Sequence, residues 1–87
     1  MRAKRTDANH KAIAKAFERI GYMVHHTIGD WDLTVTINRD VYLIEVKDPK
    51  SPNLKRRNKG DDLRDKGWPI HKVMTEQDVK EKFDTLL

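Results

Sequence analysis

Residues 29–47 read GDWDLTVTINRDVYLIEVK, and this stretch decides the fold. Apolar and polar residues alternate on both sides of a tight turn around Asn38-Arg39-Asp40, which is the pattern of a β-hairpin with one buried face. An even-numbered turn keeps all the apolar side chains of both strands on one face, whereas an odd-numbered turn scatters them and loses roughly 1.5–3 kcal/mol for each one exposed. The residues concerned are Leu33, Val35, Ile37, Tyr42, Ile44 and Val46.

The even register has a consequence for the other face of the hairpin. It is predicted to place Asp32 opposite Lys47 and Thr34 opposite Glu45, so that two carboxylates and an ammonium group gather on the face away from the core. Two converging carboxylates repel each other unless a cation lies between them. Oxygen ligands of this kind suit Mg²⁺ or Mn²⁺, which keep several waters and polarise phosphoryl oxygens. The chemistry that these residues predict is metal-dependent phosphodiester hydrolysis.

The rest of the chain predicts helices and further strands around this hairpin. A helix with one apolar stripe is expected over residues 6–20 and ends at Gly21, and a strand follows over residues 22–28. Beyond the hairpin strands, residues 31–37 and 41–47, we expect a charged helix over roughly residues 54–66, a strand over residues 69–74 and a last helix whose start carries a Thr75–Asp78 capping box. Trp68 is expected in the core or in an interface rather than as a stacking platform for bases. The prediction is one α/β (α+β) domain spanning residues 1–87, with the order αβββαβα.

Composition narrows the partners and the compartment. The chain has 87 residues, a net charge of +4 and no cysteine, which indicates a single small core and excludes disulfides and thiolate-bound zinc. No apolar run is long enough to cross a membrane, and no apolar run follows the basic start, so a cytoplasmic protein is expected. Residues 47–66 hold eight Lys or Arg against four Asp. Clustered basic residues of this kind favour a polyanion such as DNA, although they also fit a solvated helix face.

The two acidic segments carry a resemblance to a known family. GDWDL followed by LIEVKD resembles the PD-(D/E)XK nuclease signature, and RTDANHKAI, Gly21, Gly67 and the TEQDV helix start extend a similarity to the VRR-Nuc (virus-type replication-repair nuclease) domain over nearly the whole chain. The resemblance implies a restriction-endonuclease-like αβββαβ core, to which this chain adds a C-terminal helix. It also implies Mg²⁺ or Mn²⁺ as cofactor, cleavage of branched or duplex DNA, and a homodimer like those of Holliday junction resolvases. By position, it makes Asp32, Glu45 and the carbonyl of Val46 the metal ligands and Lys47 the catalytic lysine.

The chain departs from that family at three places. Trp31 stands where the family usually has proline, and the glutamine that many members carry at the start of the second helix is missing. A first-helix carboxylate often completes the family's site, and Asp7 or Asn9 is favoured here for that role over Glu18.

Substrate contacts are expected from basic residues on both sides of the hairpin, as phosphate contacts that do not read sequence. These residues are Arg5, His10, Lys50, Lys55, Arg56, Arg57 and Lys59. Two alternatives stay open, namely a non-catalytic module that binds double-stranded nucleic acid and a degenerate nuclease subunit.

Overall fold

The computed structural model describes residues 8–27, 29–50 and 59–84, and it contains three helices and four strands in these ranges. In chain order they are α1 (Ala8–Arg19), β1 (Met23–His26), β2 (Leu33–Ile37), β3 (Asp40–Val46), α2 (Lys59–Asp65), β4 (Ile70–Val73) and α3 (Glu76–Phe83). The predicted order αβββαβα is confirmed. Strands β1, β2 and β4 are shorter than predicted, whereas β3 has the predicted length and is shifted by one residue.

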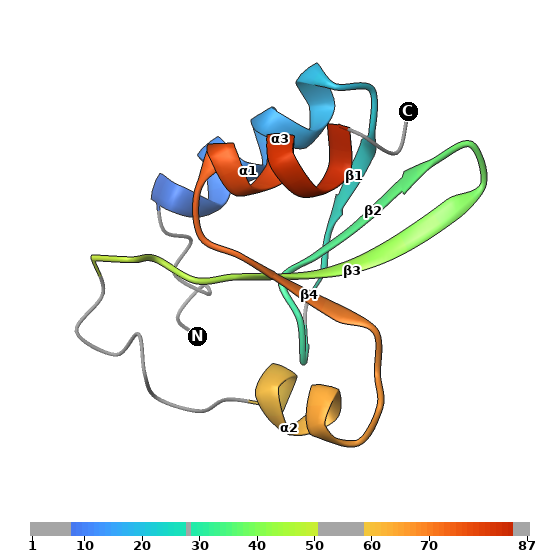
Figure 1. Cartoon of the computed structure of the whole chain (residues 1–87), viewed down its shortest axis with the longest axis vertical. Coiled ribbons are helices and arrows are strands. Elements are labelled where there is room, and N and C mark those ends of the chain that lie inside the picture. The colour runs from blue at the N-terminus through green and yellow to red at the C-terminus, as the bar shows by residue number, and fades with distance from the viewer. Residues whose placement is uncertain (1–7, 28, 51–58, 85–87) are drawn as a thin grey trace, which may run out of the picture.

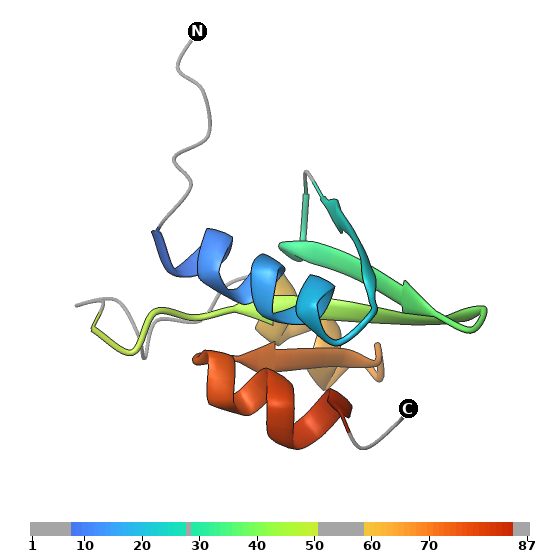
Figure 2. The ribbon, with the colours of Figure 1, turned by 90° about the horizontal axis from the view of Figure 1, so that it is seen from above.

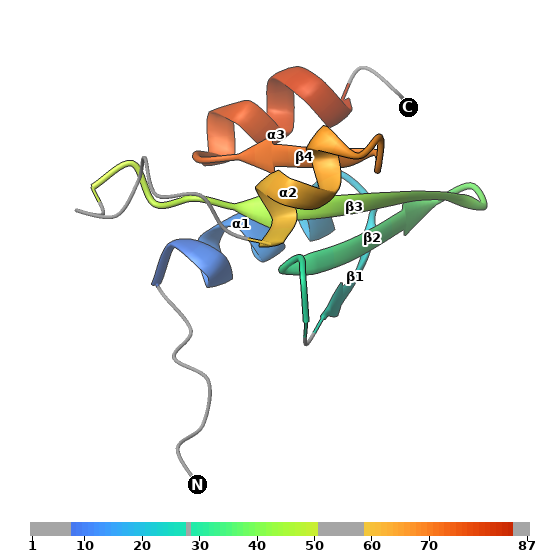
Figure 3. The same cartoon turned by 90° about the horizontal axis from the view of Figure 1, so that it is seen from below.

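The four strands form one mixed sheet in the order β1-β2-β3-β4. Strand β2 is antiparallel to both β1 and β3, while β4 runs parallel to β3. Helices α1 and α3 lie together on one side of the sheet and α2 lies on the other (Figure 1; Figure 3). The protein is therefore a small mixed α/β domain, in which the face that does not carry α1 and α3 meets α2.

The β2–β3 hairpin has the predicted parity but a different register. Ile37 pairs with Asp40, so the turn consists of Asn38 and Arg39 alone, with φ values of 52° and 73°. A two-residue turn with positive φ at both positions matches the right-handed twist of the strands, and this draws Asp40 into the ladder. The predicted pairing of Asp32 with Lys47 and of Thr34 with Glu45 is therefore wrong by two residues.

The core lies between the sheet and the helix pair α1 and α3 (Figure 2). Phe17 of α1 stacks edge-on against Phe83 of α3 with a ring-centroid distance of 4.9 Å, and both are buried against the apolar face of the hairpin. The fully buried side chains of this face are Leu33, Val35 and Ile44. The even-numbered turn thus places all three side chains in the same core, as the hydrophobic pattern predicted.

The helix ends follow their local sequence signals. Gly21 ends α1 with φ +100°, and the N–H of Tyr22 donates to the carbonyl of Phe17 over 3.0 Å. Thr75 and Asp78 cap α3 reciprocally, which confirms the predicted capping box. The Tyr22 hydroxyl donates to the carbonyl of Phe83 over 3.0 Å, and burial raises the pKa of this phenol. These contacts join the end of α1 to the end of α3.

Candidate functional site

Asp32 lies just before β2 and joins the two hairpin strands. Its main-chain N–H donates to the carbonyl of Ile44 over 3.0 Å, and its Oδ2 accepts a hydrogen bond of 2.9 Å from the N–H of Val46. The carboxylate therefore reaches the level of the Glu45-Val46-Lys47 segment although the register differs from the predicted one. The family resemblance assigns Asp32 and the carbonyl of Val46 to one metal site. The contact that the structure describes is between the Asp32 carboxylate and the N–H of Val46.

Glu45 is the most deeply buried charged residue of the described chain, with 1% of its surface exposed. Its Oε2 lies 3.1 Å from the Nη2 of Arg64 in α2. Gly60 covers the other oxygen so closely that a Cβ added there would lie 2.5 Å from Oε1. Helix α2 therefore seals the Glu45 carboxylate both by charge and by backbone contact.

Lys47 is buried as well, and its Nζ lies 3.6 Å from Oδ2 of Asp61. Oδ1 of Asp61 in turn lies 3.3 Å from Arg64 Nη2 and 3.5 Å from Lys72 Nζ. Asp61 is thus a third carboxylate of the site and, after Glu45, the second that is buried, and the sequence did not predict it. The available signal was a pair of aspartates in an otherwise basic stretch, which by itself did not distinguish a site residue from a solvated one.

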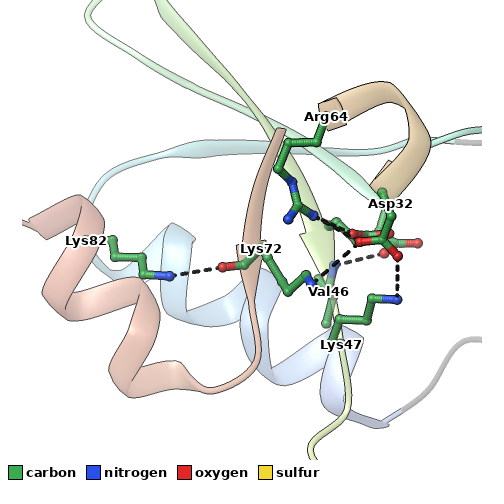
Figure 4. A network of polar contacts seen from close by, with 8 residues as sticks. Asp32, Val46, Lys47, Arg64, Lys72 and Lys82 are labelled. Atoms are coloured by element: carbon green, nitrogen blue, oxygen red, sulfur yellow. Dashed lines mark hydrogen bonds and ion pairs between the residues drawn. The ribbon is translucent and has the colours of Figure 1, made fainter. Parts of the chain in front are cut away.

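Charge at the site is internally balanced (Figure 4). Three carboxylates (Asp32, Glu45 and Asp61) lie among three cations (Lys47, Arg64 and Lys72), and the contacts join strands β3 and β4 to helix α2. A buried charge loses its hydration and is tolerated only when paired and hydrogen-bonded. The described ion pairs therefore serve Glu45 and Asp61, while Asp32 is held by the Val46 N–H and lies beside His10, and Nε of Arg64 is buried without a hydrogen-bond partner among the described residues.

Helix α1 contributes two residues near this network. Nε2 of His10 lies 3.4 Å from Oδ1 of Asp32, which places His10 within the site rather than on a separate surface for DNA. The Asn9 amide donates to the carbonyls of Lys47 at 3.0 Å and Met74 at 3.2 Å, so it ties α1 to the ends of β3 and β4. The other candidate from the first helix, Asp7, lies outside the described residues.

The predicted phosphate-binding residues are only partly described. Lys50 is exposed, and its N–H donates to the Asp48 carboxylate over 2.9 Å. The Lys59 side chain is 84% exposed and its Nζ lies 3.9 Å from Oδ1 of Asp30. Arg5, Lys55, Arg56 and Arg57 lie outside the described residues.

The predicted metal site offers the oxygen atoms of Asp32, Glu45 and Val46 to a divalent ion. Within residues 8–27, 29–50 and 59–84, no three His, Asp or Glu side chains are grouped so that they could hold a metal. The predicted set is smaller, with the carboxylates of Asp32 and Glu45 and one main-chain carbonyl, and these hard oxygen donors fit an ion that keeps several of its waters. Such an ion has to exchange with the present partners of the two carboxylates, Arg64 and His10.

One titratable group beside the network has a shifted pKa. Burial lowers the pKa of His71 below its ordinary value, and the positive charges of Lys82 and Arg64 lower it further. The ring packs edge-on against Tyr42 and Phe83, although the residue as a whole stays exposed.

Comparisons of the chain with protein-family models, with curated proteins and with solved structures found no match. In the part of the chain that the structure describes, no helix is both long enough and apolar enough to span a membrane.

Proposed function

We propose that this protein is a metal-dependent endodeoxyribonuclease of the PD-(D/E)XK type, similar to VRR-Nuc domains, that hydrolyses phosphodiester bonds in branched or duplex DNA. The observation that carries the proposal is the position of Asp32, Glu45 and Lys47 at one end of the β2–β3 hairpin, with Glu45 and Lys47 buried. Burial of these charges costs desolvation energy that apolar residues would not incur. A catalytic role gives a reason for keeping them there.

The element order supports a fold of this class. A helix, three antiparallel strands, a helix and a strand parallel to β3 are compatible with a restriction-endonuclease-like αβββαβ core. Helix α3 is the added C-terminal element. The hairpin end that carries these residues lies beside the first turn of α2, where Gly60 approaches Glu45 and Asp61 pairs with Lys47.

The residues have distinct roles in the proposed reaction. Asp32 and Glu45 would hold Mg²⁺ or Mn²⁺ together with the Val46 carbonyl, and the bound ion supplies a nucleophile at neutral pH and polarises the scissile phosphate. Lys47 stabilises negative charge that develops on the phosphate, and Asp61 positions its ammonium group. His10 lies where it can exchange a proton with groups near Asp32.

A second candidate is a non-catalytic module that binds double-stranded nucleic acid. Acidic residues on a face that meets phosphate are repulsive when they carry uncompensated charge. Here Lys47, Arg64 and Lys72 pair with Glu45 and Asp61, so these two acids alone do not exclude a binding role.

The test is a cleavage assay on labelled four-way junction, flap and linear duplex DNA with Mg²⁺, Mn²⁺ or EDTA. Asp32→Asn and Lys47→Met keep the size of each side chain and remove its charge, and Lys80→Met on the exposed face of α3 is the matched control. We expect metal-dependent cutting that falls by roughly a hundredfold or more in the two site variants and not in the control. Binding without cutting in every metal refutes the nuclease and leaves the binding module.

The proposed homodimer, acting in the cytoplasm, is tested separately. Junction resolution needs two related cuts, which a twofold dimer provides with one kind of subunit. Sedimentation at micromolar concentration with and without junction DNA should give the mass of two chains. A monomer under both conditions contradicts the dimer without affecting the hydrolytic chemistry.

A further inference from the structure

The two tryptophans of the chain lie side by side although 36 residues separate them in sequence. Trp31 comes from the β1–β2 connection and immediately precedes Asp32, and Trp68 comes from the α2–β4 connection. Their ring centroids are 6.1 Å apart and their planes are tilted by 33°. Trp68 is expected from the sequence in the core or in an interface, and because it is 47% exposed the core position is wrong.

Hydrogen bonds fix both residues in place. Nε1 of Trp31 donates to Oγ1 of Thr34 over 3.0 Å, and that hydroxyl shares a 2.9 Å hydrogen bond with Oγ1 of Thr27. The N–H of Trp68 donates to the carbonyl of Leu63 in α2 over 3.1 Å. Because the Trp31 ring is held by its own hydrogen bond and the Trp68 ring packs against it, a ligand that stacks on them meets a smaller ordering cost.

The surroundings of the pair are charged. The residue before Trp31 is Asp30, which lines a surface hollow with Lys59 and Lys66, and Lys66 lies two residues before Trp68. Asp62 and Leu63 complete the lining of this hollow. The two lysines offer ammonium groups for a phosphate, and the Lys59 side chain extends into solvent even though its Nζ lies 3.9 Å from Asp30. An exposed indole beside a second one, next to a hollow that holds two lysines and two aspartates, is suited to a nucleotide whose base stacks on an indole face while its phosphate meets an ammonium group.

We propose that Trp31 and Trp68 form a stacking platform for an unpaired nucleobase of a single-stranded or frayed DNA segment. The inference rests on the proposed function, because it assigns the kind of DNA that reaches Asp32, the residue next to Trp31 in the chain. Bases inside an intact duplex keep their faces covered by their neighbours and cannot stack on an indole, so the platform selects DNA with exposed bases. The substrate class is therefore DNA that carries an unpaired strand beside the bond to be cut.

The experiment measures binding in EDTA, where a metal-dependent reaction does not proceed. A labelled single-stranded oligonucleotide and the duplex of the same sequence are titrated with the parent protein, Trp68→Ala and Trp68→Phe. Met23→Ala is the control, since Met23 is 73% exposed and lines a different hollow. We expect Trp68→Ala to raise Kd for the single strand roughly 5- to 150-fold and to leave Kd for the duplex within about twofold, with Trp68→Phe in between.

Intrinsic fluorescence gives a readout that needs no substitution. Because the chain has two tryptophans and both belong to the platform, single-stranded DNA should quench its tryptophan emission, and the duplex should quench it much less. An unchanged Kd for Trp68→Ala, or equal loss of affinity for single strand and duplex, overturns the platform. Tryptophan-dependent binding without cutting in any metal refutes the nuclease alone, whereas cutting of frayed DNA that does not depend on Trp68 refutes the platform alone.

Discussion

Gly60 is the tightest point between α2 and the acidic network, and Gly60→Ala tests that contact directly. A Cβ at this position would lie 2.5 Å from Oε1 and 2.9 Å from Cδ of Glu45, and 3.2 Å from the carbonyl oxygen of Asp30. The Glu45 side chain is fully buried and ion-paired with Arg64, so it cannot move aside into solvent. The added methyl group therefore has to push α2 away from the sheet or displace the carboxylate.

The magnitude follows from two opposing effects. Overpacking of a tight contact costs typically about 1–3 kcal/mol. Replacement of glycine by alanine in a helix contributes up to about 1 kcal/mol in the opposite direction. We expect a net loss of about 1–2 kcal/mol in the free energy of unfolding, which lowers Tm by roughly 4–8 °C for each kcal/mol in a domain of this size.

A double-mutant cycle with Glu45→Ala identifies the cause. Urea titrations of the parent protein, the two single variants and the double variant give the cost of Gly60→Ala with and without the opposing carboxylate. Once Glu45 is truncated, only the milder 3.2 Å contact with the Asp30 carbonyl opposes the helix-propensity gain, so Gly60→Ala should cost much less than in the parent protein or become neutral. An equal cost in both backgrounds, or a parent protein stabilised by Gly60→Ala, refutes the contact.

Three further substitutions test other parts of the structure. Asn9→Ala removes the amide that bridges two main-chain carbonyls, and because each is left without this donor, urea titration should show a loss of about 1–3 kcal/mol; an unchanged midpoint contradicts the bridge. Thr75→Ala should destabilise by roughly 1 kcal/mol while Thr75→Ser restores the cap, and equal stability of both variants argues against it. His71 has its pKa lowered by burial and by Lys82 and Arg64, so the unfolded chain binds the proton more readily; stability should fall as pH drops below the ordinary imidazole value of about 6.5, and His71→Gln should lose that part of the pH dependence in urea titrations at pH 8 and pH 5.5. If the free energy of unfolding changes with pH as much in His71→Gln as in the parent protein, other groups cause the pH dependence.

The hairpin shows how far the sequence could predict the fold. The hydrophobic alternation required an even-numbered turn, and the observed pairing of Leu33 with Ile44 has that parity. The same pattern is satisfied by several even turns, and the choice among them depends on backbone conformation at Asn38 and Arg39. Asparagine accepts positive φ readily but arginine does so rarely, so no residue type marked the turn that forms.

The acidic site was predictable where its residues belong to the hairpin and unpredictable where α2 supplies them. Asp32, Glu45 and Lys47 are fixed by strand periodicity and by their spacing in the chain. Asp61 and Arg64 meet them through contacts between residues far apart in sequence, such as the 3.1 Å approach of Arg64 to Glu45. Nothing in the spacing within residues 59–65 distinguishes a helix face that covers a sheet from one that faces water.

The ion pairs of the network bear on both candidate functions, the nuclease and the nucleic-acid binding module. Lys47 comes from the end of β3, Lys72 from β4 and Arg64 from α2, so the carboxylates are compensated only when all three elements are in place. Glu45 and Asp61 therefore have cationic partners of their own, and binding of a divalent ion contributes only the difference between its interactions and those it replaces. For Glu45, the interaction to be replaced is the Arg64 ion pair, in which the carboxylate is fully buried and the guanidinium is partly exposed. Because Arg64 is the partly exposed partner, it is the one that can turn toward solvent when an ion binds Glu45. We expect this replacement of Arg64 by an ion in a nuclease, and not in a nucleic-acid binding module of the same fold.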